Sequence, residues 1–289
     1  MEDLYIAPIS VEIKNFASPR KIGQFKFRRI KKEERRKYLG LEQVEFNPDG
    51  SLYKWVYTSE SESRSPGFLD DQEYQKLIES KFIIETDNQH YMAANRELLI
   101  SAFRLFKEGA VGSPVYFSTI LRSTGYSSRL RSRNIGRYHI SKSELNSVIS
   151  LYKKITKIED KNLELSLRRF NDATSESGYK PNAFLDFITI LESLFLQDMY
   201  QELRFRFSLY ISYILNNKIG IKITFSEIKK IYDTRSELLH SGKSRNYNQD
   251  LFTLTENLTR ELVKWYINNY WKNKKAPFEL MLKDLGIKK

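Results

Sequence analysis

An arginine and a histidine lie five residues apart in the segment YDTRSELLHSG, residues 232–242. Histidine is the side chain suited to moving a proton near neutral pH, since its unperturbed pKa is about 6.5. The guanidinium of arginine keeps its charge, and its planar fork matches the oxygens of a phosphate. RNA can be cleaved by its own 2′-hydroxyl if a base removes the proton and a cation stabilises the five-coordinate phosphate. Arg235 and His240 are therefore candidate catalytic residues for RNA cleavage without a metal.

The spacing of this pair restricts the geometry of such a site. Five residues of an α-helix turn through about 500°, so the two side chains would point about 140° apart. Either the helix ends at His240, which Gly242 permits, or a second copy of the chain completes the site across a two-fold axis. The structural alternative is that His240 bonds a free carbonyl oxygen at the end of a helix.

The segment RNIGRYH contains a second pair of similar spacing, Arg133 and His139. It lies in a basic loop with a glycine that runs into a predicted strand, so no helix would hold the two side chains. The first pair lies on a predicted helix among other helices. Spacing alone does not separate the two pairs, so their context has to decide between them.

Two acidic residues are candidates for supporting the pair. Glu192 interrupts an apolar helix face in ITILESLF, and a buried carboxylate needs a partner. Arg204 or Arg206 is the expected partner across a helical hairpin, unless Glu192 lies at the rim of the apolar face. Asp233 either holds the guanidinium of Arg235 or simply covers a face exposed to solvent.

The formal net charge of +12 favours a polyanion such as nucleic acid as a partner. Residues 101–150 contain eight Lys and Arg but only two Asp and Glu. Five of these arginines lie in LRSTGYSSRLRSRNIGRYH: Arg122, Arg129, Arg131, Arg133 and Arg137. Arg129 and Arg131 are the predicted RNA contacts of this stretch, and Lys243 and Arg245 are those that follow His240. The alternative for all four is ordinary surface charge, in some cases paired with acids.

The composition is that of a folded protein, with 40% hydrophobic and 13% aromatic residues among 289. The absence of cysteine excludes disulfides and thiolate metal sites. The sequence shows no signal peptide and no apolar run of about 18 residues, so a soluble cytoplasmic protein is expected. No group of acids and histidines has the spacing of metal ligands, so no metal or other cofactor is expected.

The pattern of the chain changes near residue 142. Before this point, β-branched and aromatic residues predict strands within 4–13, 24–30, 51–58 and 115–121. A helix capped by Asn95 is also expected there. After it, apolar residues recur at helical spacing nearly to the end of the chain. The sequence thus predicts an α+β N-terminal domain over residues 1–142 and an all-α helical bundle over 143–289.

The first helix of the second half has a recognisable start. Ser141 or Ser143 ahead of Glu144 predicts a capping box. The last long helix, within 250–271, has an apolar stripe formed by Leu251, Leu254, Leu258, Leu262, Trp265 and Tyr266. This is more apolar surface than a short bundle is expected to hide, so the helical bundles of two copies are predicted to meet in a homodimer.

Four segments of the second half, LSLRRFNDA, FLDFITILESLF, ELRFRFS and YDTRSELLHSGK, resemble in order and spacing the Apea-like branch of the HEPN domains. The resemblance covers about residues 143–289 and implies a helical bundle that usually dimerises. Many members are metal-independent ribonucleases whose signature is an arginine closely followed by a histidine. The resemblance assigns this signature to Arg235 and His240. Ser236 departs from the commonest form, in which Asn, Asp or His follows the arginine.

The resemblance implies an endoribonuclease of bacterial antiphage defence or of a toxin–antitoxin system, with an N-terminal domain that senses, restrains or positions. Some HEPN proteins are inactive, so the alternative is a catalytically silent module that binds RNA or a protein partner. A third reading is a nucleic-acid-binding regulator that acts through residues 122–139. The expected partners are RNA, a second copy of the chain and an antitoxin or phage-derived trigger, without a membrane.

Overall fold

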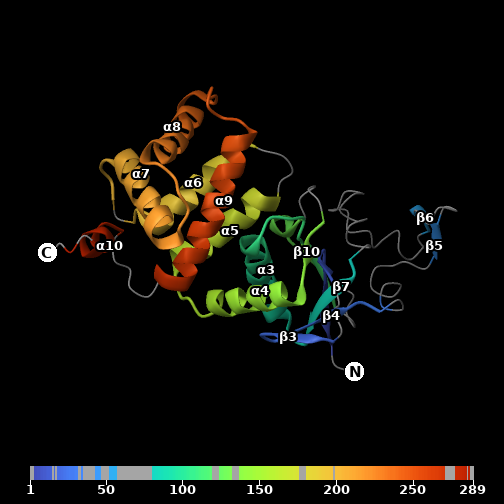
Figure 1. The fold of residues 1–289 in the computed structure, drawn as a ribbon. Helices are drawn as coiled ribbons and strands as arrows, with labels where there is room; N and C mark the ends of the chain where they lie inside the picture. Colours follow the sequence, from blue (N-terminus) through green and yellow to red (C-terminus); the bar gives the residue numbers. More distant parts are fainter. Residues whose placement is uncertain are drawn as a thin grey trace. The chain divides into compact units, whose positions relative to one another are not determined.

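The computed structural model describes residues 3–14, 16, 18–31, 34, 43–46, 52–56, 80–118, 124–131, 137–175, 180–197, 199–270, 277–284 and 286 (Figure 1). The chain divides into two compact units. One comprises Met1–Ile100 and Gly109–Asn146, and the other comprises Ser101–Glu108 and Ser147–Lys289. The N-terminal part is α+β with an antiparallel sheet, and the C-terminal region is mostly helical, which confirms the expected fold class at this level.

The first unit is built on a sheet with the strand order β3-β4-β7-β1-β8-β9, in which every pairing is antiparallel. Its strands are β1 (Tyr5–Ile9), β3 (Arg20–Ile22), β4 (Phe25–Arg29), β7 (Phe82–Thr86), β8 (Val115–Ser118) and β9 (Thr124–Tyr126). Every residue of β1 and β7 is buried, so both faces of the sheet are covered at its centre. In β4, Phe25 and Phe27 are buried while Lys26 between them is exposed. This alternation is typical of a strand with one face exposed to solvent.

Two shorter sheets and one long helix complete this part. In the described chain, β5 (Gln43–Phe46) pairs with β6 (Leu52–Val56), and β2 (Glu12–Ile13) pairs in parallel with β10 (His139–Ile140). Helix α3 (Gln89–Phe106) begins well before the expected cap. Asn88 Oδ1 accepts a hydrogen bond from the Tyr91 amide at 2.9 Å, so Asn88 caps this helix and the prediction of Asn95 was wrong.

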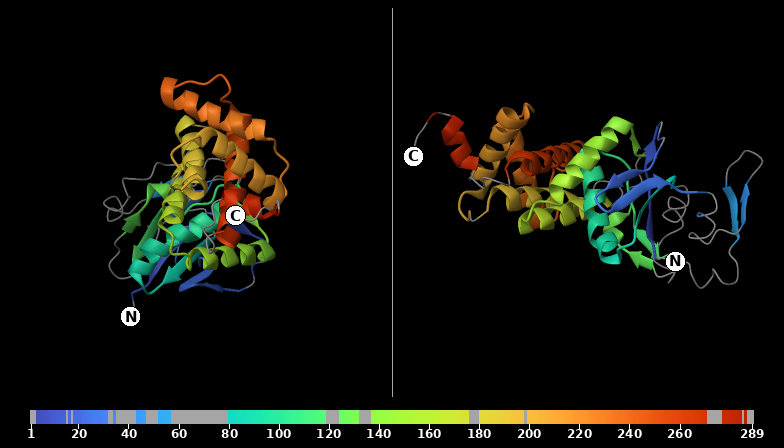
Figure 2. Two further views of the ribbon diagram at one scale, coloured as in Figure 1. Left: turned by 90° about the vertical axis from the view of Figure 1, so that its left-hand side faces the viewer. Right: turned by 90° about the horizontal axis from the view of Figure 1, so that it is seen from below.

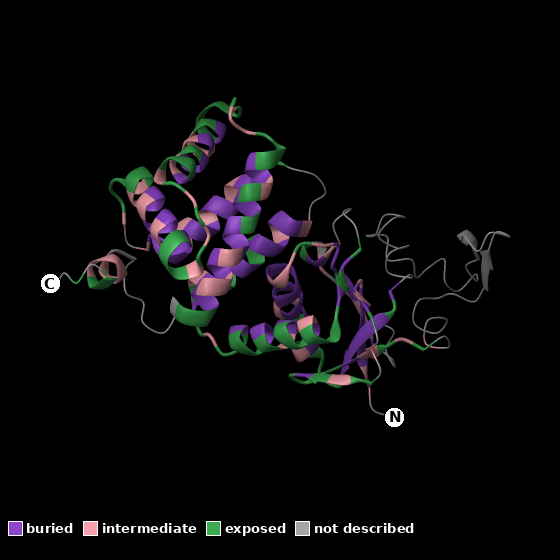
Figure 3. Cartoon of the chain, in the orientation of Figure 1, coloured by how far each residue is buried: buried purple, intermediate pink, exposed green. Residues whose placement is uncertain are grey.

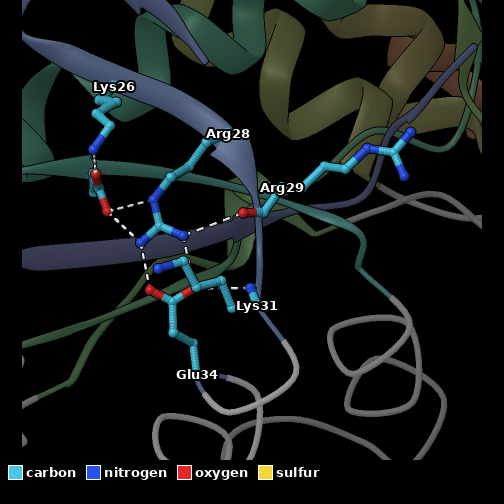
Figure 4. A network of polar contacts seen from close by, with 6 residues as sticks. Lys26, Arg28, Arg29, Lys31 and Glu34 are labelled. Atoms are coloured by element: carbon cyan, nitrogen blue, oxygen red, sulfur yellow. Dashed lines mark hydrogen bonds and ion pairs between the residues drawn. The ribbon is translucent and has the colours of Figure 1, made fainter. Parts of the chain in front are cut away.

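A network of charges joins β4 to β7 and to the chain that follows β4 (Figure 4). Arg28 Nε donates to Glu85 Oε2 at 2.8 Å, and its Nη1 and Nη2 each donate to Glu34 at 2.6 Å. Lys26 Nζ lies 2.8 Å from the other oxygen of Glu85. Although burial opposes it, these cations hold the pKa of both carboxyls below the usual value. Arg28 therefore bridges two ionised carboxylates.

The C-terminal region consists of helices joined by short connections (Figure 2). Its α-helices are α4 (Lys142–Ile155), α5 (Lys161–Ser175), α6 (Pro181–Phe195), α7 (Leu203–Ile214), α8 (Phe225–Ser241), α9 (Gln249–Trp265) and α10 (Pro277–Asp284). Short π-helical turns, Leu215–Ile219 and Tyr266–Tyr270, extend α7 and α9. Helix α6 packs against α5, α9 and α8, and α7 packs against α8, so α6 lies at the centre of the bundle.

The core of the bundle is aromatic, and Figure 3 shows buried residues on the inward sides of its helices. Phe187 on α6 has its ring centre 6.0 Å from that of Phe170 on α5 and 5.7 Å from that of Phe252 on α9. All three rings are at most 3% exposed. The three helices thus share one hydrophobic core, which supplies most of the stability of such a bundle.

The apolar stripe of α9 is used within the bundle. Leu258, Leu262 and Tyr266 are at most 4% exposed, and Leu254 alone among the leucines of the stripe is exposed, at 38%. The expectation that a single bundle would leave this stripe uncovered was therefore wrong, because one bundle hides nearly all of it. The homodimer itself stays a prediction. Among the described residues, no helix combines the length and apolar character needed to cross a membrane.

Candidate active site

Helix α8 carries both members of the predicted pair. It begins with a capping box, in which Glu227 N donates to Thr224 Oγ1 at 3.2 Å and Thr224 N donates to Glu227 Oε2 at 2.7 Å. It runs without a break past His240 to Ser241 and ends at Gly242, whose φ of 68° is left-handed. Arg235 and His240 therefore lie in one regular helix, and the divergence of about 140° applies to them.

Arg235 is held against the bundle by an acid on α6. Its Nη2 donates to Glu192 Oε2 at 3.2 Å, and the two side chains are 26% and 18% exposed. The guanidinium carbon also lies 5.5 Å from the ring centre of Tyr232. Glu192 thus has a partner, as expected for an acid in an apolar face, but Arg204 and Arg206 were the wrong candidates.

Tyr232 is the second side chain that meets Glu192. Its ring is 5% exposed and lies 5.0 Å from the ring of Phe207 on α7. Burial, together with the charge of Glu192 and a hydrogen bond to it, raises the pKa of Tyr232 to about 12. The phenol therefore stays protonated near neutral pH and serves as a donor to the carboxylate that also binds Arg235.

Asp233 does not support Arg235. Its carboxylate accepts from Arg204 Nη2 at 2.5 Å and also contacts Arg204 Nε, so it links α8 to the start of α7. This hydrogen bond raises the pKa of Arg204. Of the two acids expected beside the pair, only Glu192 contacts the arginine of the pair, and Asp233 has a structural role between two helices.

His240 lies on the exposed side of the last turn of α8. It makes no hydrogen bond and no ion pair with any described residue, so the structure does not show the bond to a helix-end carbonyl that was the structural alternative. Leu239 beside it is 52% exposed. His240 is thus available to solvent and to a partner, while Arg235 faces α6.

The loop after His240 is fixed by serine hydroxyls that the sequence had not indicated. Ser241 Oγ lies 2.7 Å from the carbonyl oxygens of both Glu237 and Lys243, to either of which it can donate its one proton. Ser244 Oγ donates to Glu237 Oε2 at 2.5 Å. Lys243 and Arg245 are exposed in this loop. Their position close to His240 agrees with the prediction, and their role as RNA contacts stays a prediction.

The competing pair belongs to the other unit. His139 lies opposite Glu12 in the β2–β10 pairing, with its Nδ1 3.2 Å from Glu12 Oε2. Arg137 and Lys81 also contact this carboxylate, and against the effect of burial the three residues hold its pKa below the usual value. Arg133 lies outside the described residues. The ring of His139 is therefore already in contact with a carboxylate of its own unit.

The arginine stretch is described only in part. Arg129 is exposed and Arg131 is half-buried, whereas Arg122 and Arg133 lie outside the described residues. Arg129 and Arg131 each have interactions within the chain. Their role in binding RNA stays a prediction.

The described residues contain no group of three or more histidines and acids close enough to hold a metal ion. The pair on α8 consists of an arginine fixed by Glu192 and a free histidine at the helix end, without a contact between them. Searches against family models, curated proteins and solved structures returned no match to this chain.

Proposed function

We propose that this chain is a metal-independent endoribonuclease of the HEPN type, with Arg235 and His240 as its catalytic residues. The observation that carries this proposal is that the two side chains, although on one helix, differ in their contacts. Arg235 is held in place by Glu192 yet keeps 26% of its side chain exposed, and His240 is exposed and unengaged. A phosphate-binding cation needs a fixed position, whereas a proton-transferring group must reach the substrate.

The chemistry follows from the properties of the two groups. His240 takes the proton from the 2′-hydroxyl of RNA, and the oxygen then attacks the adjacent phosphorus. Arg235 stabilises the charge of the five-coordinate phosphate, for which it retains donors, since Glu192 accepts from only one of its nitrogens. The bond from phosphorus to the 5′-oxygen then breaks, and this oxygen takes up a proton from water while His240 returns its proton to the solvent. The other product ends in a 2′,3′-cyclic phosphate. Lys243 and Arg245 bind flanking phosphates.

The geometry of α8 favours a site shared between two copies of the chain. Because the two side chains diverge by about 140° on one helix, Arg235 of one copy and His240 of the other would act on one phosphate across a two-fold axis. Exposed apolar side chains support such contact, since Leu239 next to His240 is 52% exposed and Phe205 on α7 is 55% exposed. We therefore retain the homodimer on this basis and not on that of α9.

In this proposal the HEPN bundle comprises residues 143–289, and residues 1–142 sense, restrain or position. The protein acts in the cytoplasm, in antiphage defence or as the toxin of a toxin–antitoxin system, and a phage-derived trigger or an antitoxin controls it. Arg129 and Arg131 would add RNA contacts from the N-terminal domain.

One observation favours a second candidate, a catalytically silent module that binds RNA or a protein. Arg235 is already bound to Glu192, and it makes no contact with His240. An arginine that only links α8 to α6 would show the same contacts. Activity therefore has to be measured.

The test is cleavage of total RNA by the purified full chain in the presence of EDTA. We expect wild type to produce fragments with 2′,3′-cyclic phosphate ends, and His240→Ala to lower the rate by roughly 10²–10⁴-fold, as for loss of a positioned acid–base group. His139→Ala is the matched control and should keep its activity. Loss of cleavage in His139→Ala but not in His240→Ala would identify the other pair. A wild-type dimer that cleaves no RNA with any trigger would support the silent module.

A further inference from the structure

Arg96 in the middle of α3 is a buried charge that the proposed function does not use. The residue is 2% exposed, and neither its Nε nor its Nη1, both fully buried, has a hydrogen-bond partner. Buried polar groups nearly always have partners, and a buried charge without one is strongly unfavourable. Such an exception in a folded protein needs an explanation, and a ligand that supplies the missing acceptors is one.

The other two buried arginines of the described chain, by contrast, have hydrogen-bond acceptors. Arg260 is 5% exposed, and each of its three nitrogens has an acceptor, at 2.7–2.8 Å. Arg104 is 3% exposed and donates to the backbone and side-chain oxygens of Asn171 at 2.9 and 3.3 Å. Among the buried arginines of the described chain, Arg96 alone lacks an oxygen acceptor.

The surroundings of Arg96 are aromatic on one side and tightly packed. The ring centre of Tyr116 on β8 lies 4.8 Å from the guanidinium carbon. The same ring rests on Gly125 of β9, where an added Cβ would come within 1.9 Å of Tyr116 Cε1. The glycine thus lets the ring lie where it contacts Arg96. This contact engages the face of the guanidinium, and the N–H groups in its plane are left without acceptors.

Among the described residues, Arg96 makes no ion pair with an acid. Glu97, the next residue of the helix, and Tyr116 act to raise the pKa of Arg96, but they do not offset the effect of burial, which lowers this pKa to about 10. At neutral pH the guanidinium is nevertheless charged. The N-terminal unit therefore holds a positive charge that is almost wholly buried and has two buried donors without a hydrogen-bond partner.

We propose that Arg96 is the binding residue of an oxyanion site in the N-terminal unit, which takes the phosphate or carboxylate group of a small ligand. An oxyanion supplies both things that Arg96 lacks, a negative charge and several acceptors that match a guanidinium fork. Because the guanidinium is buried, only a small group can reach it. This site is independent of Arg235 and His240 and gives the N-terminal unit a ligand of its own.

The experiment is thermal unfolding of the full chain with inorganic phosphate, a nucleoside 5′-monophosphate or citrate. A ligand that binds only the folded protein raises the melting temperature as its concentration increases. We expect at least one probe to do so for wild type, and the responding probe distinguishes a free phosphate, a nucleotide and a carboxylate. Arg96→Met should lose this response, and without any probe its melting temperature should equal or exceed that of wild type, because an unpaired buried charge is removed.

The matched control is Arg29→Met. Arg29 belongs to the same unit and also lies over an aromatic ring, 5.6 Å from the ring centre of Phe82, but it is exposed. This variant should keep the full response to the probe. Titration calorimetry of wild type with the same probes gives a measurement that does not require any variant to fold. No heat of binding with any probe, or an equal thermal response in wild type and Arg96→Met, would overturn the proposal.

Discussion

Glu192 is the residue on which the candidate site depends most, because two side chains of α8 share its carboxylate. Arg235 donates to it at 3.2 Å, and the buried phenol of Tyr232 is hydrogen-bonded to it. Removing the carboxylate would leave a buried hydroxyl without an acceptor and a half-buried guanidinium without its counter-charge. Both effects destabilise the packing of α8 on α6.

Glu192→Ala is expected to lower the free energy of unfolding by about 1–3 kcal/mol, the usual cost of leaving a buried polar group unsatisfied. Urea unfolding followed by circular dichroism measures this loss. Asp233→Ala is the matched control, since it breaks the more exposed pair with Arg204 and should cost clearly less. Similar losses in the two variants would show that Glu192 is not buried as described here.

The raised pKa of Tyr232 predicts that the protein loses stability at alkaline pH. The unfolded phenol loses its proton near its ordinary pKa of 10.0, whereas the folded one keeps it up to about 12. The folded state therefore binds more protons between these values, so this contribution to stability is complete below pH 10 and is lost as the pH rises towards 12. The difference in unfolding free energy between wild type and Tyr232→Phe should shrink over this interval. A difference that is constant with pH would contradict the assignment.

At the scale of elements, a local feature such as a helix cap could be predicted from the sequence. Ser141 and Glu144 form the expected capping box, with Glu144 N donating to Ser141 Oγ at 3.2 Å and Ser141 N to Glu144 Oε2 at 2.7 Å. The start of α3 was missed because it depends on a contact between elements. Tyr91 in its first turn packs on Phe25 of β4, with 4.8 Å between ring centres, and this holds a part of the helix that the apolar pattern does not require.

Contacts between helices were harder to predict than the helices themselves. Glu192 and Arg235 are 43 residues apart, and their pairing depends on how α8 packs on α6. The apolar stripe of α9 was identified correctly, but its partner was not, because a hydrophobic pattern shows that a face is covered without showing by what. For the same reason the sequence named the arginine and the histidine but not the serines that fix the following loop.

Gly242 ends helix α8, and its replacement tests how far this helix end depends on a glycine. An added Cβ would meet no atom within 4 Å, so only its φ of 68° penalises another residue. Gly242→Ala is expected to lower the free energy of unfolding by roughly 1–2 kcal/mol, the cost of a left-handed conformation for an ordinary residue. Gly242→Asn should cost less, because Asn tolerates this conformation. Equal urea midpoints for the two variants would show that the end of α8 does not depend on the glycine.

At the scale of the whole molecule, the divergence of Arg235 and His240 raises a question that can be tested: whether one chain forms the site or two copies share it. If each site combines Arg235 of one copy with His240 of the other, a mixed dimer of Arg235→Ala and His240→Ala contains one intact site and one without either group. Random mixing makes about half of the dimers mixed, so about a quarter of the wild-type activity should return. Mixing equal amounts of the two purified variants under conditions that let subunits exchange, followed by the RNA cleavage assay, measures this recovery.

Each variant alone is the control for that experiment and should stay inactive. Recovery on mixing would establish the shared site directly. If mixing two inactive variants that form dimers restores nothing, each site takes both groups from one chain, and α8 must change its shape before it acts.

The two ion pairs of α8 lie two residues apart, about 200° around the helix axis. Arg235 reaches α6 on one side, and Asp233 binds Arg204 of α7 on the other. Any rotation of α8 about its own axis would therefore strain both pairs together. The direction of His240 is fixed by this restraint although the histidine itself touches nothing that holds it. A ligand or partner that separated Arg204 from Asp233 would free the helix to rotate and would thereby re-aim a side chain almost two helical turns away.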